Sequence, residues 1–140
     1  MPNETFRVEQ IDHVEVFVPD RYEAAAWYER VLGLVILRDL EDWAVPGGPL
    51  MISSDDGRTM LALFEGEPLG SREPVGHIRV AFRVDGAGFR QFRSRLDDVA
   101  VFNHTGARVT SASVVDHGKA FSIYFSDPYG NRCEATTYDY

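Results

Sequence analysis

The chain carries one pattern of apolar and polar positions twice. Apolar and polar residues alternate over residues 13–18 and again over 77–84, and a helical pattern follows each of these segments. Strict alternation predicts a half-buried strand, whereas apolar residues three and four positions apart predict an amphipathic helix. Because His13 and His77 open the two alternating segments, the two halves of the chain are predicted to be equivalent modules.

Each predicted helix has an N-cap residue and an apolar face. Asp20 and Asp85 have short side chains whose oxygens can accept the free N–H groups of a first helical turn. Glu23 follows Asp20 at the spacing of a capping box, and Gly33 can end the first helix because glycine adopts positive φ readily. The apolar positions are predicted to pack in the core rather than to line a cofactor site; they are Ala24, Trp27, Tyr28 and Val31, then Phe89, Phe92 and Leu96.

Three short runs of β-like residues follow each helix. The last two runs of each half are separated by turn-forming sequences, Asp-Asp-Gly at 55–57 and Asp-Pro-Tyr-Gly-Asn at 127–131. These residue types favour turns through their backbone angles or their side-chain hydrogen bonds. Each half is therefore predicted to continue as three strands, over residues 35–37, 44–52 and 59–64 in the first and 107–115, 121–125 and 132–136 in the second.

The two modules are predicted to form a single domain of residues 1–140. Module one spans about 10–66 and module two about 76–138, with a connection of Gly, Pro and charged residues between them. A strand, a helix and three strands in each half indicate an α+β fold of two βαβββ modules. We expect their mixed sheets to form a curved, half-closed barrel with the helices outside and a pocket on its concave face.

Composition and charge exclude several partner classes. The formal net charge is −8 and no basic cluster offsets it, so we expect no binding to nucleic acid. No apolar segment approaches the roughly 20 residues of a membrane-spanning helix, so we expect no membrane partner. The first residues do not resemble a secretory signal. The single cysteine, Cys133, excludes an internal disulfide and a cysteine-built zinc site, and a cytoplasmic location is predicted.

Alternation places polar side chains on the pocket face of the predicted sheet, and Cys133 on the opposite, helix-packed face. Polar groups that face an interior need a partner, water or a ligand. Two histidines at equivalent places in a repeat, together with a carboxylate on the last strand, indicate a metal site rather than an ordinary solvent-facing sheet. The polar residues assigned to this face are His13, Glu15, His77, Arg79, Tyr124, Arg132 and Glu134.

In these segments the chain resembles the vicinal oxygen chelate superfamily, which includes glyoxalases, fosfomycin-resistance transferases and extradiol ring-cleaving dioxygenases. The resemblance covers nearly the whole chain. It rests on Ile-Asp-His-Val at 11–14, the helix at 27–34, His77 with its strand, and residues 126–134. The most specific part is the last, which is similar to the Asp-Pro-x-Gly-x-x-x-Glu ending of the superfamily.

The resemblance implies that His13, His77 and Glu134 bind one divalent metal ion. Glyoxalase I-like members draw a fourth protein ligand from the last strand of the first module. Matching the glycine turns of the two halves places Leu61 there, and leucine cannot ligate. Three ligands leave positions open for substrate, water or oxygen, a set that suits Fe(II) and is also compatible with Mn(II), Ni(II) or Zn(II).

A longer motif, from residue 115 to Glu134, resembles the extradiol dioxygenase signature. In that family its histidine and tyrosine line the pocket, hydrogen-bond the substrate or the oxygen intermediate, and assist proton transfer. The resemblance therefore implies that His117 and Tyr124 are catalytic. Unlike the larger extradiol enzymes, the chain has no further histidine between its two metal-binding ones, which leaves other acid–base work to His117 or Glu15.

Three functions stay open at this point. One is an Fe(II) extradiol-type dioxygenase whose small catechol-like substrate chelates the metal through two vicinal oxygens. The second is a glyoxalase-like or fosfomycin-resistance-like isomerase or transferase that polarises an oxyanion, and the third is a metal-free small-molecule binding protein. In each, Glu15, Arg79 and Arg132 are expected to contact the small molecule. The resemblance also implies a homodimer, in which His13 of one chain can complete the metal site of the other.

Overall fold

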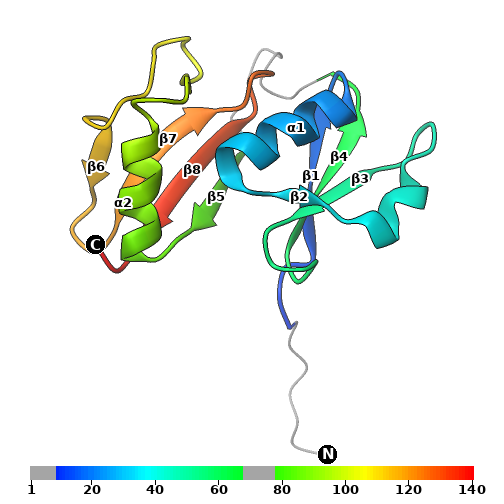
Figure 1. Cartoon of the computed structure of the whole chain (residues 1–140), viewed down its shortest axis with the longest axis horizontal. Helices are drawn as coiled ribbons and strands as arrows, with labels where there is room; N and C mark the ends of the chain where they lie inside the picture. Colours follow the sequence, from blue (N-terminus) through cyan, green and yellow to red (C-terminus); the bar gives the residue numbers. More distant parts are fainter. Residues whose placement is uncertain (1–8, 68–77) are drawn as a thin grey trace, which may run out of the picture. The chain divides into compact units, whose positions relative to one another are not determined.

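A computed structural model describes residues 9–67 and 78–140. These residues divide into two compact units, one formed by residues 9–15 and 21–64 and the other by 16–20, 65–67 and 78–140. Each half follows the order strand, helix and three strands, which confirms the predicted α+β fold of two βαβββ modules (Figure 1). The grouping of both modules into one domain stays a prediction.

The first module forms a four-stranded sheet in the order β1-β4-β3-β2. The strands β2 and β3 pair antiparallel, as do β3 and β4, in a register that sets Met51 opposite Ala62. A short 3-10 helix, η1, lies between β2 and β3. The elements are β1 (His13–Val18), α1 (Arg21–Leu32), β2 (Val35–Ile36), η1 (Arg38–Trp43), β3 (Leu50–Ser53) and β4 (Met60–Glu65).

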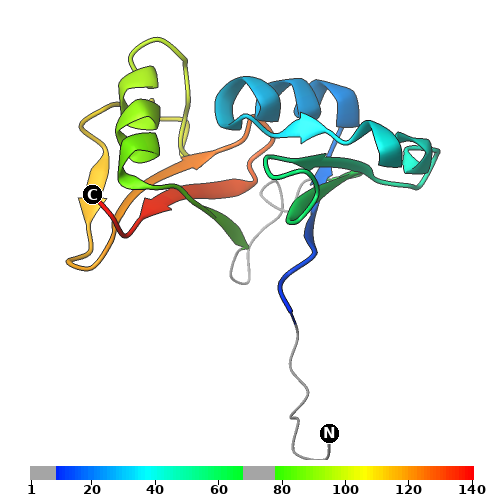
Figure 2. The same cartoon turned by 60° about the horizontal axis from the view of Figure 1, so that its bottom comes forward.

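The second module repeats this order as β5-β8-β7-β6. The strands β5 and β8 run parallel, whereas β7 pairs antiparallel with both β8 and β6. The helix α2 lies along one face of this sheet (Figures 1 and 2). The elements are β5 (Arg79–Arg83), α2 (Gly86–Arg95), β6 (Val114–Asp116), β7 (Phe121–Ser126) and β8 (Arg132–Thr137).

The buried residues follow the predicted periodicities. The apolar residues predicted for the first helix are all buried, and Phe89 and Leu96 of the second are buried as well. Phe92 packs against Phe125 of β7, with ring centroids 5.4 Å apart. Cys133 is also buried, as predicted for the helix-packed face. The face of β7 and β8 that bears Phe125 and Cys133 is therefore the one covered by α2, and the opposite face carries the polar side chains.

Two helix boundaries were predicted correctly. Asp85 caps α2 by accepting a hydrogen bond from the Gly88 N–H at 2.7 Å. Gly33 adopts φ 71° directly after α1 and donates its N–H to the Glu29 carbonyl at 3.0 Å. Within the described part of the chain, no helix is long and apolar enough to cross a membrane.

The residues that follow β8 are bound to α2. Asp139 accepts a hydrogen bond from the Gly86 N–H at 3.2 Å. The Tyr140 ring packs against Phe89 (centroids 4.9 Å apart), and its hydroxyl accepts a hydrogen bond from Arg93 at 2.6 Å. A Cβ atom on Gly86 would overlap the Asp139 carbonyl oxygen, so this contact requires glycine.

Two predicted strands are shorter than expected. The run predicted over 44–52 contributes only β3, because prolines at 46 and 49 cannot donate to a ladder. Its first part is a loop held by Arg21, which donates to the Val45 carbonyl at 3.0 Å and the Gly48 carbonyl at 2.6 Å.

The run predicted over 107–115 contributes only β6, and Arg108 makes an isolated bridge to Phe102 instead. Asn103 turns the chain there, because its side-chain oxygen accepts the N–H groups of two later residues. Ile78 falls in the alternating segment predicted as a strand over 77–84, but it precedes β5 and is 62% exposed.

The turn between β3 and β4 is held by Asp55. Its Oδ1 accepts the Thr59 N–H at 2.9 Å and lies 2.8 Å from the Ser53 hydroxyl oxygen. Both hydrogen bonds lower the pKa of Asp55 from its ordinary value, and the one from the Thr59 backbone N–H has the larger effect. A carboxyl group whose pKa is lowered by folding adds stability above its unfolded pKa of about 3.9, and this stability is lost as the pH falls through the folded pKa.

We therefore expect Asp55→Asn to lower the melting temperature at pH 7 and to have progressively less effect as the pH falls below about 4. Circular dichroism melts at pH 7, 4 and 3 would measure this. Asp42→Asn, which changes an exposed carboxylate in η1, serves as the matched control and should leave the melting temperature unchanged. A loss of equal size at pH 3 and pH 7 would contradict the assignment of the stabilisation to the charged carboxylate.

Candidate metal and catalytic site

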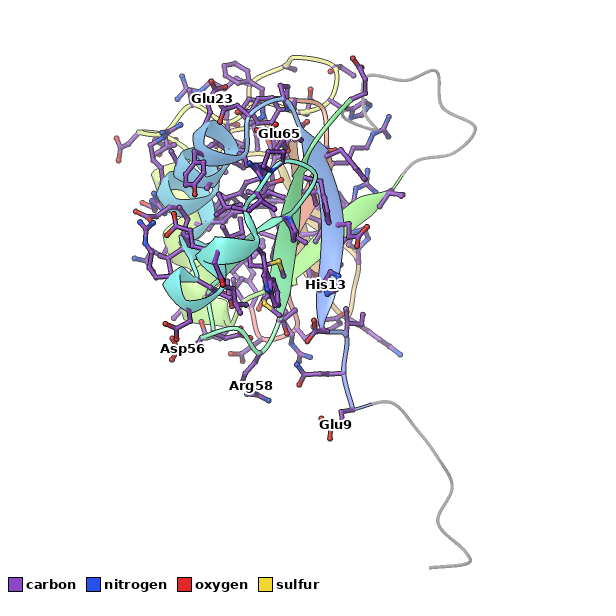
Figure 3. The ribbon with its side chains drawn as sticks, turned by 90° about the vertical axis from the view of Figure 1, so that its right-hand side faces the viewer. Glu9, His13, Glu23, Asp56, Arg58 and Glu65 are labelled. Atoms are coloured by element: carbon purple, nitrogen blue, oxygen red, sulfur yellow. The ribbon has the colours of Figure 1, made fainter. Side chains whose placement is uncertain are left out.

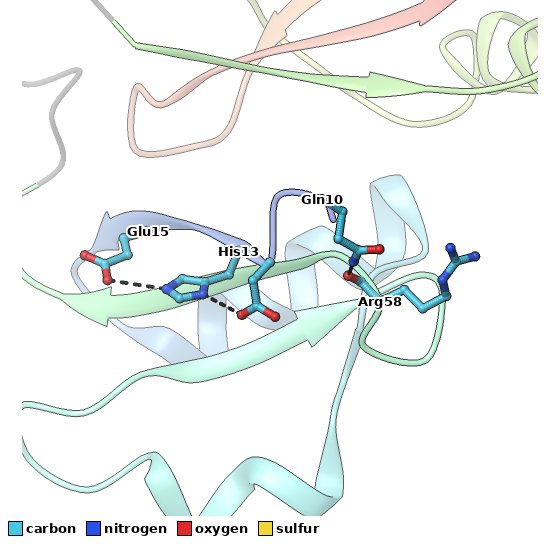
Figure 4. A network of polar contacts seen from close by, with 5 residues as sticks. Gln10, His13, Glu15 and Arg58 are labelled. Carbon is cyan, nitrogen blue, oxygen red and sulfur yellow. Dashed lines mark hydrogen bonds and ion pairs between the residues drawn. The ribbon is translucent and has the colours of Figure 1, made fainter. Parts of the chain in front are cut away.

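His13 opens β1 (Figure 3), and a carboxylate lies on either side of its imidazole (Figure 4). Its Nδ1 lies 2.8 Å from Asp12 Oδ2, and its Nε2 lies 3.6 Å from Glu15 Oε2. The hydrogen bond with Asp12 raises the pKa of His13; partial burial opposes this increase, and the nearby Glu15 carboxylate adds to it. In the neutral ring, Asp12 favours the tautomer with its proton on Nδ1, which leaves the Nε2 lone pair for a ligand.

The segment before His13 is anchored to the β3–β4 turn. The Gln10 side chain donates a hydrogen bond to the Arg58 carbonyl oxygen (Figure 4). The Met60 N–H donates to the Asp12 carbonyl at 3.0 Å. These contacts hold the segment directly before His13, and the main-chain hydrogen bond at the Asp12 carbonyl helps to set the direction in which His13 leaves the strand.

Glu134 lies half-buried in β8 between Ala81 of β5 and Tyr124 of β7. Its Oε2 accepts a hydrogen bond from the Ser122 hydroxyl at 2.8 Å, and Ser122 Oγ lies 3.1 Å from Thr136 Oγ1. Among the described residues, no arginine, lysine or histidine forms an ion pair with Glu134. A neutral hydroxyl therefore orients this carboxylate without neutralising it.

His117 and Tyr124 are hydrogen-bonded to each other. His117 Nε2 lies 2.8 Å from the Tyr124 hydroxyl oxygen, and the two rings meet edge to face. The His117 N–H donates to the Ala120 carbonyl at 2.8 Å, and Gly118 has φ 84°, so a tight turn after β6 positions the histidine. The guanidinium carbon of Arg79 lies 4.8 Å from the centroid of the Tyr124 ring.

The structure brings together the predicted site residues of the second module. Tyr124 and Glu134 are register partners, and so are Arg79 and Arg132, which places all four on one face of the sheet. His13 and Glu15 lie side by side on β1 in the first module. His77 lies outside the described residues. Within residues 9–67 and 78–140, no group of three or more His, Cys, Asp or Glu side chains is arranged to hold a metal ion, and the ligand triad stays a prediction.

Strand register corrects the match between Leu61 and Glu134. The hydrogen bond from the Met60 N–H to the Asp12 carbonyl pairs Met60 with His13 in a parallel ladder. Side chains alternate along a strand, so Leu61 points to the face opposite His13. The match by glycine turns was therefore wrong, because the connection between β3 and β4 is longer than that between β7 and β8.

The residue equivalent to Glu134 in the first module is Phe64. Glu134 pairs with Ala81, which lies four residues after His77 in the sequence. In the first module Met60 is the register partner of His13, so the residue four positions after Met60, which is Phe64, is the equivalent of Glu134. A phenyl ring offers no ligand atom, so this position supplies no fourth ligand. The expectation that the first module lacks this ligand therefore holds for Phe64 as it did for Leu61.

Sequence reasoning missed Asp12 and Ser122, the hydrogen-bond partners of two predicted ligands. An acidic residue directly before His13 was the available signal for the first. Alternation along β7 and β8 places Ser122 on the same face as Glu134, which was the signal for the second.

A sequence profile of the Glyoxalase/Bleomycin resistance protein/Dioxygenase superfamily matches residues 10–135. The chain belongs to this superfamily. Its members typically bind a divalent metal, act on small molecules and commonly form dimers. No curated protein shows significant sequence similarity to the chain.

Several solved structures share the fold of this superfamily member. Lactoylglutathione lyase from Agrobacterium tumefaciens is 21% identical, with a TM-score of 0.66 over 94% of this chain and 95% of that one. A glyoxalase/dioxygenase from Nostoc punctiforme is 19% identical, with a TM-score of 0.64 over 99% of both chains. The fosfomycin resistance protein FosX from Mesorhizobium loti is 20% identical, with a TM-score of 0.61 over 94% and 93%.

The donor groups of this superfamily member fit a divalent metal. A carboxylate hydrogen-bonded to the far ring nitrogen, as Asp12 is to His13, orients a histidine ligand and increases its basicity. Glu134 keeps its negative charge uncompensated among the described residues while Ser122 fixes its orientation. Imidazole nitrogen and carboxylate oxygen are each ligand types that divalent metals accept in proteins.

Proposed function

We propose that this protein is an Fe(II) extradiol-type dioxygenase that cleaves a small catechol-like substrate. The observation that carries the proposal is the hydrogen bond between His117 and Tyr124 on the face that bears Glu134. In the proposed site His13, His77 and Glu134 hold the metal, which when bound supplies Lewis acidity and open positions for two vicinal oxygens and O₂. This proposal rests on the family, on the donor groups and on the motif from residue 115 to Glu134.

His117 and Tyr124 are suited to proton transfer. Chelation of a catechol requires at least one hydroxyl proton to leave, and a nearby base lowers the cost of that step. The Tyr124 hydroxyl can hydrogen-bond the substrate while His117, which is exposed, exchanges protons with solvent. The Arg79 guanidinium lies over the Tyr124 ring and helps to hold the ring in place.

A second candidate is a metal-dependent isomerase or transferase of the glyoxalase or fosfomycin-resistance type. It is favoured by Arg79 and Arg132, whose positive charges can bind an oxyanion. The hydrogen-bonded pair of His117 and Tyr124 would also serve an isomerase, because a proton moved between adjacent carbons needs the same kind of base. The two candidates differ in whether O₂ is consumed.

The test is O₂ uptake by the Fe(II)-loaded protein with a panel of catechols. We expect uptake with a ring-opened product, and we expect Tyr124→Phe to lower the rate about 10²- to 10⁴-fold while the iron content is unchanged. Tyr138→Phe is the matched control, because Tyr138 stacks with Arg83 in the same module and should keep the full rate.

Failure of uptake with iron bound stoichiometrically would contradict the dioxygenase and favour the isomerase or transferase. A full rate in Tyr124→Phe would remove Tyr124 from the catalytic residues. Size-exclusion chromatography with light scattering on the same preparation tests the homodimer, which stays a prediction of the resemblance.

A further inference from the structure

We infer that Arg79 and Arg132 bind an anionic group of the substrate, a carboxylate or a phosphonate, beside Glu134. The inference rests on the proposed function for the location of the site. It adds a substrate class, because an unsubstituted catechol carries no such group.

The two arginines are directly paired across the sheet. Arg79 of β5 and Arg132 of β8 are register partners in the parallel ladder. Their backbones are therefore about 4.8 Å apart, and their side chains leave the sheet on the same face. Like charges directly opposite each other destabilise a sheet, so this pair costs the fold stability unless an anion neutralises it.

Arg79 extends across β8 toward β7. Its guanidinium carbon lies 4.8 Å from the ring centroid of Tyr124, and Tyr124 is the β7 partner of Glu134. Stacking uses the flat face of a guanidinium and leaves the N–H donors at its edge available. The donors of Arg79 are therefore available to a ligand beside Tyr124, the register partner of Glu134.

Within the described residues, the structure records no carboxylate partner for Arg79 or Arg132. The chain contains 22 acidic and 14 basic residues, so acidic partners are in excess. Other arginines of the chain are bonded within the fold: Arg38 pairs with Glu41 at 2.9 Å, and Arg93 donates to the Ser111 carbonyl at 2.7 Å. Two arginines that are register partners, leave the sheet on the same face and have no recorded carboxylate partner among the described residues can together hold a planar or tetrahedral oxyanion.

Arg83 provides an internal control. It lies on the same strand and the same face as Arg79, four residues further along β5. Its register partner is Thr136 instead of a second arginine, and its guanidinium stacks over Tyr138 at 4.8 Å. It therefore has the charge and the aromatic contact of Arg79 but lacks the paired arginine.

The test uses the full chain with metal removed by chelation, and titrates it with benzoate, phenylphosphonate and the neutral benzamide. Calorimetry or ¹H–¹⁵N NMR shifts give the affinities. We expect an anion to bind and benzamide not to bind. Arg79→Gln and Arg132→Gln should each weaken anion binding about ten-fold or more, and Arg83→Gln should not. Neither Arg79→Gln nor Arg132→Gln should lower the melting temperature of the unliganded protein, because each removes a repulsion.

Equal affinity for benzoate and benzamide would overturn the inference, as would anion binding that is unchanged in both variants or lost equally in Arg83→Gln. Tighter binding of benzoate than of phenylphosphonate assigns the group to a carboxylate, and the reverse order assigns it to a phosphonate. The titration needs neither metal nor turnover, so an absence of O₂ uptake would overturn the dioxygenase without touching this result. Loss of anion binding would in turn leave the dioxygenase standing.

Discussion

Glu134→Gln is expected to lower the affinity for Fe(II) or Mn(II) by more than about 100-fold and to abolish activity. Loss of an outer hydrogen-bond partner of a ligand already costs about 10- to 100-fold, and this change removes the charge of a ligand itself. The amide keeps the shape of the side chain and can still accept the Ser122 hydrogen bond, so the fold should be retained. Competition with a chromophoric chelator measures the affinity.

Glu29→Gln is the matched control for this change, because Glu29 is an exposed carboxylate on α1. It should bind metal as the unaltered protein does. Full metal affinity in Glu134→Gln would exclude Glu134 from the ligand set and, with it, the proposed triad. His13→Ala tested in the same assay would show whether the histidine beside Asp12 is a ligand.

Phe89→Ala should cost about 3–5 kcal/mol of unfolding free energy, the usual range for deleting a buried phenyl ring. Phe89 is 0% exposed, and its ring meets Tyr140 edge to face. The unfolding free energy of a typical domain is about 5–15 kcal/mol, so this loss is a large fraction of the whole. Urea denaturation followed by circular dichroism measures the change in midpoint.

Phe102→Ala controls for the loss of an aromatic ring as such. Phe102 lies in the same module and is 48% exposed, so its removal should change stability by no more than about 0.5 kcal/mol. Equal destabilisation by the two changes would show that α2 does not pack through Phe89 as described.

Much of the fold was predictable because alternation and helical spacing report burial directly. The strand at 13–18 and the cap at Asp85 were both predicted correctly. The predictions failed where apolar residues are not paired in a sheet, as in 44–49, where Arg21 holds a proline-containing loop. Hydrophobicity alone cannot distinguish such a loop from a strand, since apolar residues also occur in loops, as Val45 does here with 55% of its surface exposed.

The site was predictable to a smaller extent. Alternation placed Tyr124 and Glu134 on one face, which the register confirms. The contact between His117 and Tyr124 could not be derived from periodicity, because His117 follows the end of β6 and a turn decides its direction. Leu61 was misplaced because the glycine turns of the two halves are not equivalent, and the resulting shift of three residues from Phe64 to Leu61 is odd and therefore reverses the face of the side chain.

The contact between Gly86 and Asp139 has a consequence for exchanging modules between relatives. Helix propensity favours alanine over glycine at an ordinary helical position, yet here the Asp139 carbonyl occupies the space that a methyl group would need. A residue with a side chain can therefore replace Gly86 at the start of α2 only if the segment after β8 changes with it. A chimera that takes α2 from one superfamily member and its final residues from another must inherit both as a matched set, or lose the cover over Phe89.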